Sequence, residues 1–185
     1  GRRERHRASL ARAHRIDGEE PWLLAVGMMR PGDKLASYRQ LAAALTHLMT
    51  KHWRLLIAGG GPAQAEVRRA FAGFKGRVHW LGALSAAQLA GVYAASDLLV
   101  WPAVNEAIGL AVLEAQAAGL PAVVGRAGAL DGIVADGKTG VLVAPGDTRA
   151  FAAAIAGLLA DAGRRRAFGR AALAKTRRLH DLAAA

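Results

Sequence analysis

Short, largely apolar segments alternate with helical patterns along most of the chain, and this alternation restricts the possible folds more than any other feature. The apolar runs, which have the character of strands covered on both faces, are 22–27, 54–59, 77–81, 97–101, 122–125 and 140–143. The helical patterns between and after them are 35–51, 62–74, 85–95, 109–118, 147–160 and 164–180. Such alternation favours parallel strands joined by helical crossovers. The sequence therefore predicts an α/β fold, a Rossmann-like, open, mostly parallel six-stranded sheet with helices on both faces.

Composition agrees with one folded domain and excludes several classes of protein. The chain has 185 residues, of which 53% are hydrophobic and 21% charged, so it can bury a sizeable core. It has no cysteine, which rules out disulfides, thiolate metal sites and a cysteine nucleophile. No apolar run approaches the ~20 residues that span a bilayer, and residues 1–5 do not begin a signal peptide. We expect a cytoplasmic location, or a peripheral one at the inner membrane face.

The net charge of +11 is concentrated toward the two ends. Residues 161–185 carry seven basic and two acidic residues, and residues 1–20 carry six and four. These charges could be solvated helix faces, or a surface that meets a polyanion such as nucleic acid or anionic lipid. Aromatic residues for base stacking are not interleaved with the basic ones at either end, which disfavours a nucleic-acid-binding module.

Residues 1–20 differ from the rest of the chain. They form only a ragged helical pattern, which Gly18 and Pro21 interrupt. We expect a connector or lead-in arm over 1–20 and one ligand-binding domain over 21–185. In sheets of the predicted type, ligands bind beyond the carboxyl ends of the strands, here the loops 27–34, 59–62, 81–85 and 102–109.

Two glutamates flank the start of the helix that follows the fourth strand. Glu106 lies in the loop, and Glu114, eight positions further, lies in the helix. The free amides and positive dipole end of a helix attract an anion, and Gly109 permits close approach to the backbone. Ionised carboxylates on either side could accept hydrogen bonds from hydroxyls, so a diphosphate between two sugars would match this layout. Alternatively, Glu106 caps the helix and Glu114 is solvated.

Two other loops could contact phosphate. Arg30 and Lys34 follow the first strand and could neutralise a pyrophosphate, or they could be surface charges of an ordinary turn. The glycine-rich turn 59–62 fits phosphate binding and tight strand-to-helix packing equally well.

Metal and hydrolase patterns have no support in the sequence. His47 and His52 are five residues apart, and neither HExxH nor Asp-x-Asp occurs. His79 alternates with apolar residues on a strand and is interpreted as structural. The chain contains no GxSxG elbow for a serine nucleophile.

Taken together, these loops resemble the C-terminal, donor-binding domain of GT-B retaining glycosyltransferases, the group called group 1 or family four. The resemblance extends over about 22–178. Its most specific part is 106–121, which looks like the E-x7-E signature of that family. The other matching segments are 56–62, 78–82, 95–102, 136–140 and 145–147.

The resemblance implies a nucleotide-sugar donor, a UDP-, GDP- or ADP-sugar, and no metal or cofactor. Glu114 would hold the ribose hydroxyls, and Glu106 would contact the donor sugar. Lys34 and Arg30 would neutralise the diphosphate and stabilise the leaving nucleotide.

The same resemblance assigns binding roles to apolar positions. The amides of Ile108, Gly109 and Leu110 would bind the diphosphate, and Leu84 would flank the base. Two positions depart from the family pattern, because Met28 stands where an arginine is usual and Ile108 replaces phenylalanine.

The family's N-terminal domain, which normally supplies the acceptor site, has no counterpart in this sequence. We therefore expect that the isolated domain is inactive and that the acceptor is a glycan or a lipid-linked glycan. Two other hypotheses stay open, a basic nucleic-acid-binding module and half of a nucleotide-sugar epimerase. A dinucleotide oxidoreductase is disfavoured, because the first strand lacks the glycine fingerprint.

Overall fold

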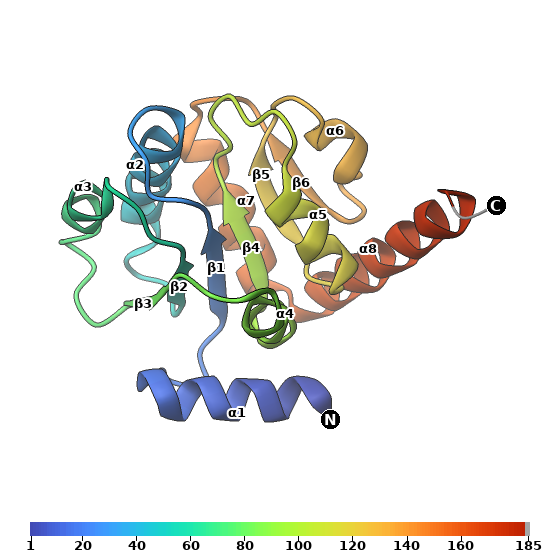
Figure 1. The fold of residues 1–185 in the computed structure, drawn as a ribbon, viewed down its shortest axis with the longest axis horizontal. Helices are drawn as coiled ribbons and strands as arrows, with labels where there is room; N and C mark the ends of the chain where they lie inside the picture. The colour runs from blue at the N-terminus through green and yellow to red at the C-terminus, as the bar shows by residue number, and fades with distance from the viewer. Residues whose placement is uncertain (184–185) are drawn as a thin grey trace.

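The computed structural model describes residues 1–183 and shows a single six-stranded sheet in which every pairing is parallel (Figure 1). The strands are β1 (Trp22–Val26), β2 (Arg54–Ala58), β3 (Val78–Gly82), β4 (Leu98–Trp101), β5 (Ala122–Gly125) and β6 (Gly140–Val143). Their order across the sheet is β3-β2-β1-β4-β5-β6. The predicted Rossmann-like α/β fold is confirmed, and each predicted strand lies within about one residue of its observed bounds.

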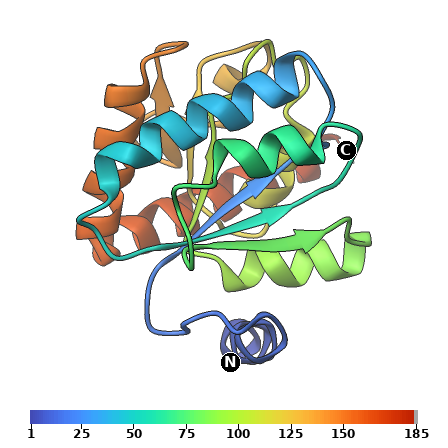
Figure 2. The same cartoon turned by 90° about the vertical axis from the view of Figure 1, so that its left-hand side faces the viewer.

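Helices cover both faces of the sheet (Figure 2). Their bounds are α1 (Arg2–His14), α2 (Asp33–Leu45), α3 (Gln64–Ala70), α4 (Ala86–Ala95), α5 (Leu110–Ala117), α6 (Leu130–Ile133), α7 (Thr148–Ala160) and α8 (Ala162–Ala183). On one face, α2 packs against α3 and α7; on the other, α4 and α5 are neighbours, with α1 outside α4 and α8 against α5. None of the described helices is both long and apolar enough to cross a membrane.

The core forms because the central strands are apolar on both faces. In β1, Leu24 is fully buried and lies in register with Leu56 of β2 and Leu99 of β4. Buried aromatic residues with polar atoms find backbone acceptors: the Tyr38 hydroxyl donates to the carbonyl of Gly27 at 2.7 Å, and Trp53 Nε1 donates to that of Leu48 at 2.9 Å. These bonds remove the cost of burying the polar atoms.

Helix bounds differ from the sequence predictions more than strand bounds do. The pattern over 35–51 becomes α2 followed by a 3-10 turn (Thr46–Leu48), and the pattern over 62–74 becomes the shorter α3. Beyond α3 the backbone bonds switch to three-residue spacing, from Phe71 to Arg68 and from Phe74 to Phe71, while both phenylalanines are buried. Tertiary packing of these rings therefore ends the helix before its apolar pattern ends.

Residues 1–20 contain a regular helix, α1, although their apolar residues follow a helical spacing only irregularly. Helix α1 packs along α4, and the Arg7 guanidinium donates to the carbonyls of Gly18, Ala95 and Glu20 at 2.9, 2.9 and 2.6 Å. This single side chain ties α1 to the segment that leads into β1. The role of 1–20 as a connector remains a prediction.

The glycine-rich turn after β2 is explained by backbone packing. Gly59 has φ +142, and a Cβ there would overlap the carbonyl oxygen of Gly27. The Met29 N–H donates to the Gly60 carbonyl at 2.9 Å, and the Ala63 N–H donates to the Met29 carbonyl at 2.8 Å. Of the two interpretations of this turn, tight packing accounts for Gly59 and Gly61, where a Cβ would overlap backbone atoms of the loop after β1.

Replacing Gly59 with alanine should destabilise the fold by about 2–4 kcal/mol, because the added methyl meets backbone that cannot move away. Gly60→Ala is the matched control, since its Cβ would meet nothing within 4 Å, and its cost should stay under about 1 kcal/mol. Urea unfolding of both variants tests this. Equal losses of stability would contradict the packing explanation.

Candidate functional site

The reversal of strand order locates the candidate site. β1 and β4 are neighbours, but the chain leaves β1 toward β2 and leaves β4 toward β5. The loops after these two strands therefore diverge at their carboxyl ends, which is where ligands bind in open parallel sheets. The loop after β1 leads into α2, and the loop after β4 leads into α5.

An ion pair joins the two diverging segments. Lys34 Nζ, in the first turn of α2, lies 2.5 Å from Glu106 Oε2 in the loop after β4. Both side chains are largely buried, with exposed fractions of 18% and 15%. Trp101, the last residue of β4, donates from Nε1 to the same carboxylate oxygen at 3.2 Å, and its ring lies 5.5 Å from Lys34 Nζ. The structure thus brings Lys34 and Glu106, which are distant in sequence, into direct contact.

The surroundings of Glu106 stabilise its charged form. Burial alone raises the pKa of Glu106, but hydrogen bonds from Lys34 and Trp101, the charge of Lys34 and the backbone amide of Gly109 together hold that pKa below its ordinary value. Glu106 is therefore ionised at neutral pH. This carboxylate supplies a negative charge beside the start of α5.

The start of α5 exposes apolar side chains around a constrained glycine. Gly109 is left-handed, with φ 71, and the position of a Cβ would be occupied by a methyl of Leu130 from α6. Packing and backbone conformation therefore require glycine here. On either side, Ile108 and Leu110 are 72% and 59% exposed.

The loop before α5 is held in an unusual conformation. Ala103 and Asn105 have φ values of 59 and 48, which cost non-glycine residues about 1 kcal/mol each. Bonds to α2 help to hold the loop: the Ser37 hydroxyl accepts from the Val104 N–H at 3.0 Å, and Asn105 Nδ2 donates to Asp33 Oδ1 at 3.1 Å. Strained conformations of this kind cluster at functional sites.

Glu114 has a different partner from Glu106. It is exposed on α5 and accepts a hydrogen bond from the Tyr93 hydroxyl of α4 at 3.0 Å. Burial raises the pKa of Tyr93, and the charge of Glu114 raises it further, so the phenol stays protonated and donates. The structure thus places Glu114 between α4 and α5 rather than in the Lys34–Glu106 pair.

Two other predicted site residues, Arg30 and Leu84, form no ion pair or hydrogen bond with Lys34 or Glu106 among the described residues. The Arg30 side chain is exposed and makes no ion pair with the described residues. Leu84 is half-buried at the end of β3, where it lines a cavity together with His6 and Leu10 of α1. Their proposed contacts with phosphate and base stay predictions.

Sequence reasoning missed two residues of the site, Trp101 and Tyr93. Trp101 is the last residue of β4 and directly precedes the loop 102–109, which the sequence predicts to lie at the ligand-binding edge. This position could have identified it as a site residue. Tyr93 had no comparable signal, because its contact with Glu114 depends on how α4 packs against α5. Across residues 1–183, no group of three or more histidine and acidic side chains is placed to hold a metal ion.

The strand order defines a Rossmann-type domain, and the charged pair at its reversal marks a candidate ligand site at the carboxyl edge of its sheet. Residues 20–161 match the family described as Glycosyl transferases group 1. The chain belongs to that family, as its E-x7-E resemblance indicated.

Individual relatives agree with the assignment. The D-inositol 3-phosphate glycosyltransferase of Salinispora tropica is 36% identical over 186 residues, covering 91% of this chain and 38% of the relative. The sulfoquinovosyl transferase SQD2 of Arabidopsis thaliana is 36% identical over 126 residues, covering 66% and 24%. The chain therefore spans less than half the length of these relatives.

Solved GT-B structures share the fold. The sucrose-phosphate synthase of Thermosynechococcus elongatus superimposes with a TM-score of 0.81 and 30% identity, over 93% of this chain and 44% of that one. HepE of Anabaena, solved with UDP and glucose, gives a TM-score of 0.82 at 20% identity, over 94% and 48%.

The low pKa of Glu106 predicts a pH-dependent stability. A carboxylate whose pKa is lowered by folding stabilises the protein above the ordinary pKa of 4.5, and this contribution is lost as pH falls through the lower folded-state value. At pH 7, Glu106→Gln should cost about 1–3 kcal/mol, because Lys34 loses its partner. Urea unfolding from pH 7 to 3.5 should show the difference from wild type shrinking below pH 4.5. A constant difference over this range would contradict the assignment.

Proposed function

We propose that this chain is the donor-binding domain of a retaining, metal-independent glycosyltransferase. It would bind a nucleotide-diphosphate sugar and, as an isolated domain, transfer little or no sugar. The observation that carries the proposal is the Lys34–Glu106 pair, which lies at the reversal of strand order beside the start of α5. The family assignment favours this hypothesis over a nucleic-acid module or half of an epimerase.

Each side chain has a role in the proposal. The leaving nucleoside diphosphate gains negative charge as the bond to the sugar breaks, so a fixed cation and oriented amides near it lower the barrier. Lys34, with Arg30 from the loop after β1, is the cation source, and the amides of 108–110 are the donors. Glu106 would contact the donor sugar, and Glu114 would hold the ribose hydroxyls.

The observed contacts add two steps to this scheme. Lys34 is paired with Glu106, so in this scheme it would exchange the carboxylate for a phosphate when the donor binds. Glu114 already accepts from Tyr93, which fixes one of its oxygens and leaves acceptor capacity for a hydroxyl. HepE, whose structures contain UDP or UDP-glucose, shares the fold and supports a nucleotide-sugar as ligand.

The rest of the enzyme follows from the relatives by analogy. A partner N-terminal domain of the same protein would supply the acceptor site, and the acceptor would be a glycan or a lipid-linked glycan. The exposed apolar residues beside the site, Met28, Ile108 and Leu110, would then be covered by donor or partner domain. A cytoplasmic location, or a peripheral one at the inner membrane face, is part of this proposal.

Removing the ribose-binding carboxylate should weaken nucleotide binding. In calorimetry with UDP, GDP and ADP, we expect one of the three to bind, and Glu114→Ala to reduce its affinity by about tenfold, because charged hydrogen bonds contribute 1.5–3 kcal/mol. Glu4→Ala, which removes an exposed glutamate of α1, is the control and should bind as wild type does. EDTA should leave the affinity unchanged. A folded chain that binds none of the three nucleotides would overturn the proposal.

Removing the positive charge of Lys34 should weaken binding of a nucleoside diphosphate more than binding of the matching monophosphate. Lys34→Ala should weaken binding of the nucleoside diphosphate by about tenfold and of the matching monophosphate by under about threefold, because Lys34 is assigned to the diphosphate. Lys51→Ala, an exposed lysine of the turn before β2, is the matched control. Equal losses for the two nucleotides would show that Lys34 does not contact the diphosphate.

A further inference from the structure

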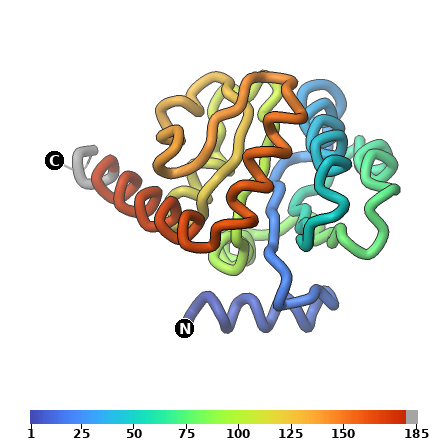
Figure 3. Tube along the Cα trace, turned by 180° about the vertical axis from the view of Figure 1, so that it is seen from behind, coloured from blue at the N-terminus to red at the C-terminus, as the bar shows by residue number. Residues whose placement is uncertain are grey.

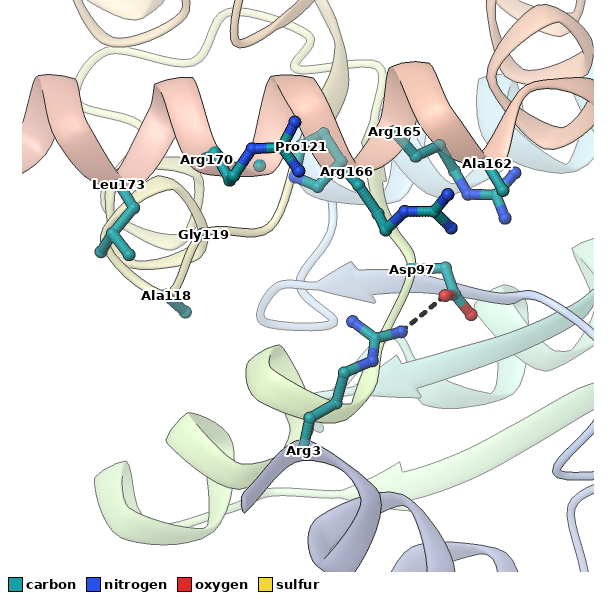
Figure 4. A pocket seen from close by; sticks show the side chains of 11 residues that line it. Arg3, Asp97, Ala118, Gly119, Pro121, Ala162, Arg165, Arg166, Arg170 and Leu173 are labelled. Carbon is teal, nitrogen blue, oxygen red and sulfur yellow. Dashed lines mark hydrogen bonds and ion pairs between the residues drawn. The ribbon is translucent and has the colours of Figure 1, made fainter. Parts of the chain in front are cut away.

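A second concave region lies at the opposite end of the sheet from the candidate site. It has a volume of about 490 Å³ and lies between α8 and the start of α1 (Figure 4). α1 and α8 lie at the same end of the molecule, as the view from behind shows (Figure 3). The charged residues that line this region are Arg3, Asp97, Arg165, Arg166 and Arg170, and the others are glycine, alanine, proline or leucine.

The lining of this cavity is strongly basic. It contains four arginines and one aspartate, which leaves a net charge of +3. Asp97 is already committed: it accepts from Arg3 at 2.6 Å, from Arg7 at 3.0 Å and from the Trp22 N–H at 2.8 Å. Asp97 carries one negative charge against four lining arginines, so positive charge stays in excess around the cavity although Asp97 also attracts Arg165.

Those three arginines differ in how they are held. Arg165 donates from one nitrogen to the carbonyls of Leu158 and Leu159 at 2.5 and 2.7 Å, which fixes its position at the end of α7. Arg166 and Arg170 lie one helical turn apart, and neither has an ion pair or a side-chain hydrogen bond with residues whose side chains are described. Figure 4 shows both beside the opening that Arg3 faces.

The guanidinium groups influence one another, as expected for charges around one space. Burial lowers the pKa of Arg165; Asp97 raises it, and the charges of Arg166 and Arg3 lower it again. Like charges four residues apart on a helix are mildly unfavourable. A bound anion would relieve this repulsion.

Backbone packing makes the cavity floor rigid. Gly169 of α8 lies against Gly119 in the turn before β5, and a Cβ on Gly169 would overlap the Gly119 carbonyl oxygen. This contact seats α8 directly on the turn. The positions that flank it, including Arg166 and Arg170, are therefore placed by the fold rather than by a flexible tail.

We propose that this cavity binds a multiply charged phosphate compound, either free in solution or as a lipid headgroup. Guanidinium groups bind phosphate oxygens in a bidentate manner, and the volume exceeds what one phosphate ion needs. Aromatic rings are absent from the eleven lining residues, so base stacking is not available and a nucleic acid is disfavoured.

This site is separate from the proposed donor site and does not depend on it. Asp97 and Pro121 immediately precede β4 and β5, whereas Glu106 follows β4. A strand of four residues separates the two edges of the sheet by about 13 Å.

Calorimetry of the 185-residue chain with tripolyphosphate at low salt tests the proposal. We expect the wild type to bind, and the double variant R166Q/R170Q to lose affinity by about tenfold or more. The double variant R177Q/R178Q removes the same charge from exposed positions of α8 outside the cavity and should change affinity by under about threefold. Thermal unfolding of each variant checks that it is folded.

Two further measurements locate the site and its ligand. Binding of tripolyphosphate should persist in Lys34→Ala, which separates it from the donor site. Sedimentation with vesicles that contain cardiolipin, whose headgroup carries two phosphates, against phosphatidylcholine vesicles distinguishes the sources: pelleting that R166Q/R170Q abolishes indicates a headgroup, and its absence beside tripolyphosphate binding indicates a soluble ligand. Equal losses in both double variants, loss in Lys34→Ala alone, or no binding of either probe would overturn the proposal.

Discussion

Burial of both faces of a parallel sheet is the constraint on which the rest of this structure depends. Because Leu24 and its cross-strand neighbours are covered on both sides, helices must alternate with strands, and every loop that follows a strand emerges at one edge. The reversal of direction between β1 and β4 then separates two of these loops. The ion pair between Lys34 and Glu106 connects the segment after β1 to the loop after β4 and places one positive and one negative charge in the site.

The two charges at the centre of the candidate site neutralise each other. Glu106 holds Lys34 and lies beside the amide of Gly109, so the negative charge that a helix start attracts is already present. In the proposed function, a diphosphate would replace this carboxylate as the partner of Lys34. The strained loop at Ala103 and Asn105 is tied to α2 by Ser37 and positions Glu106 beside Lys34.

The carboxyl and amino edges of the sheet differ in how their charged side chains are paired. At the carboxyl edge, Lys34 is paired with Glu106, and Met28, Ile108 and Leu110 expose apolar side chains. At the amino edge, Asp97 is saturated by Arg3, Arg7 and a backbone amide, and the arginines of α8 remain in excess. Part of the positive charge at the two chain ends lines one cavity, because Arg3 of α1 and three arginines of α8 lie at the same end of the fold.

The sequence by itself determined the six strands, the parallel sheet and the loops that carry Lys34 and Glu106, because strand and crossover patterns depend on local apolar periodicity. It did not determine where the helix after Pro62 ends, the hydrogen bonds of Trp101 and Tyr93, or whether the glycine turn 59–62 serves packing. Those features depend on which side chains and carbonyls meet across the sheet, as Gly59 meets Gly27 and Gly169 meets Gly119. Only the tertiary structure decided them, because residues distant in sequence occupy the same space only after the chain has folded.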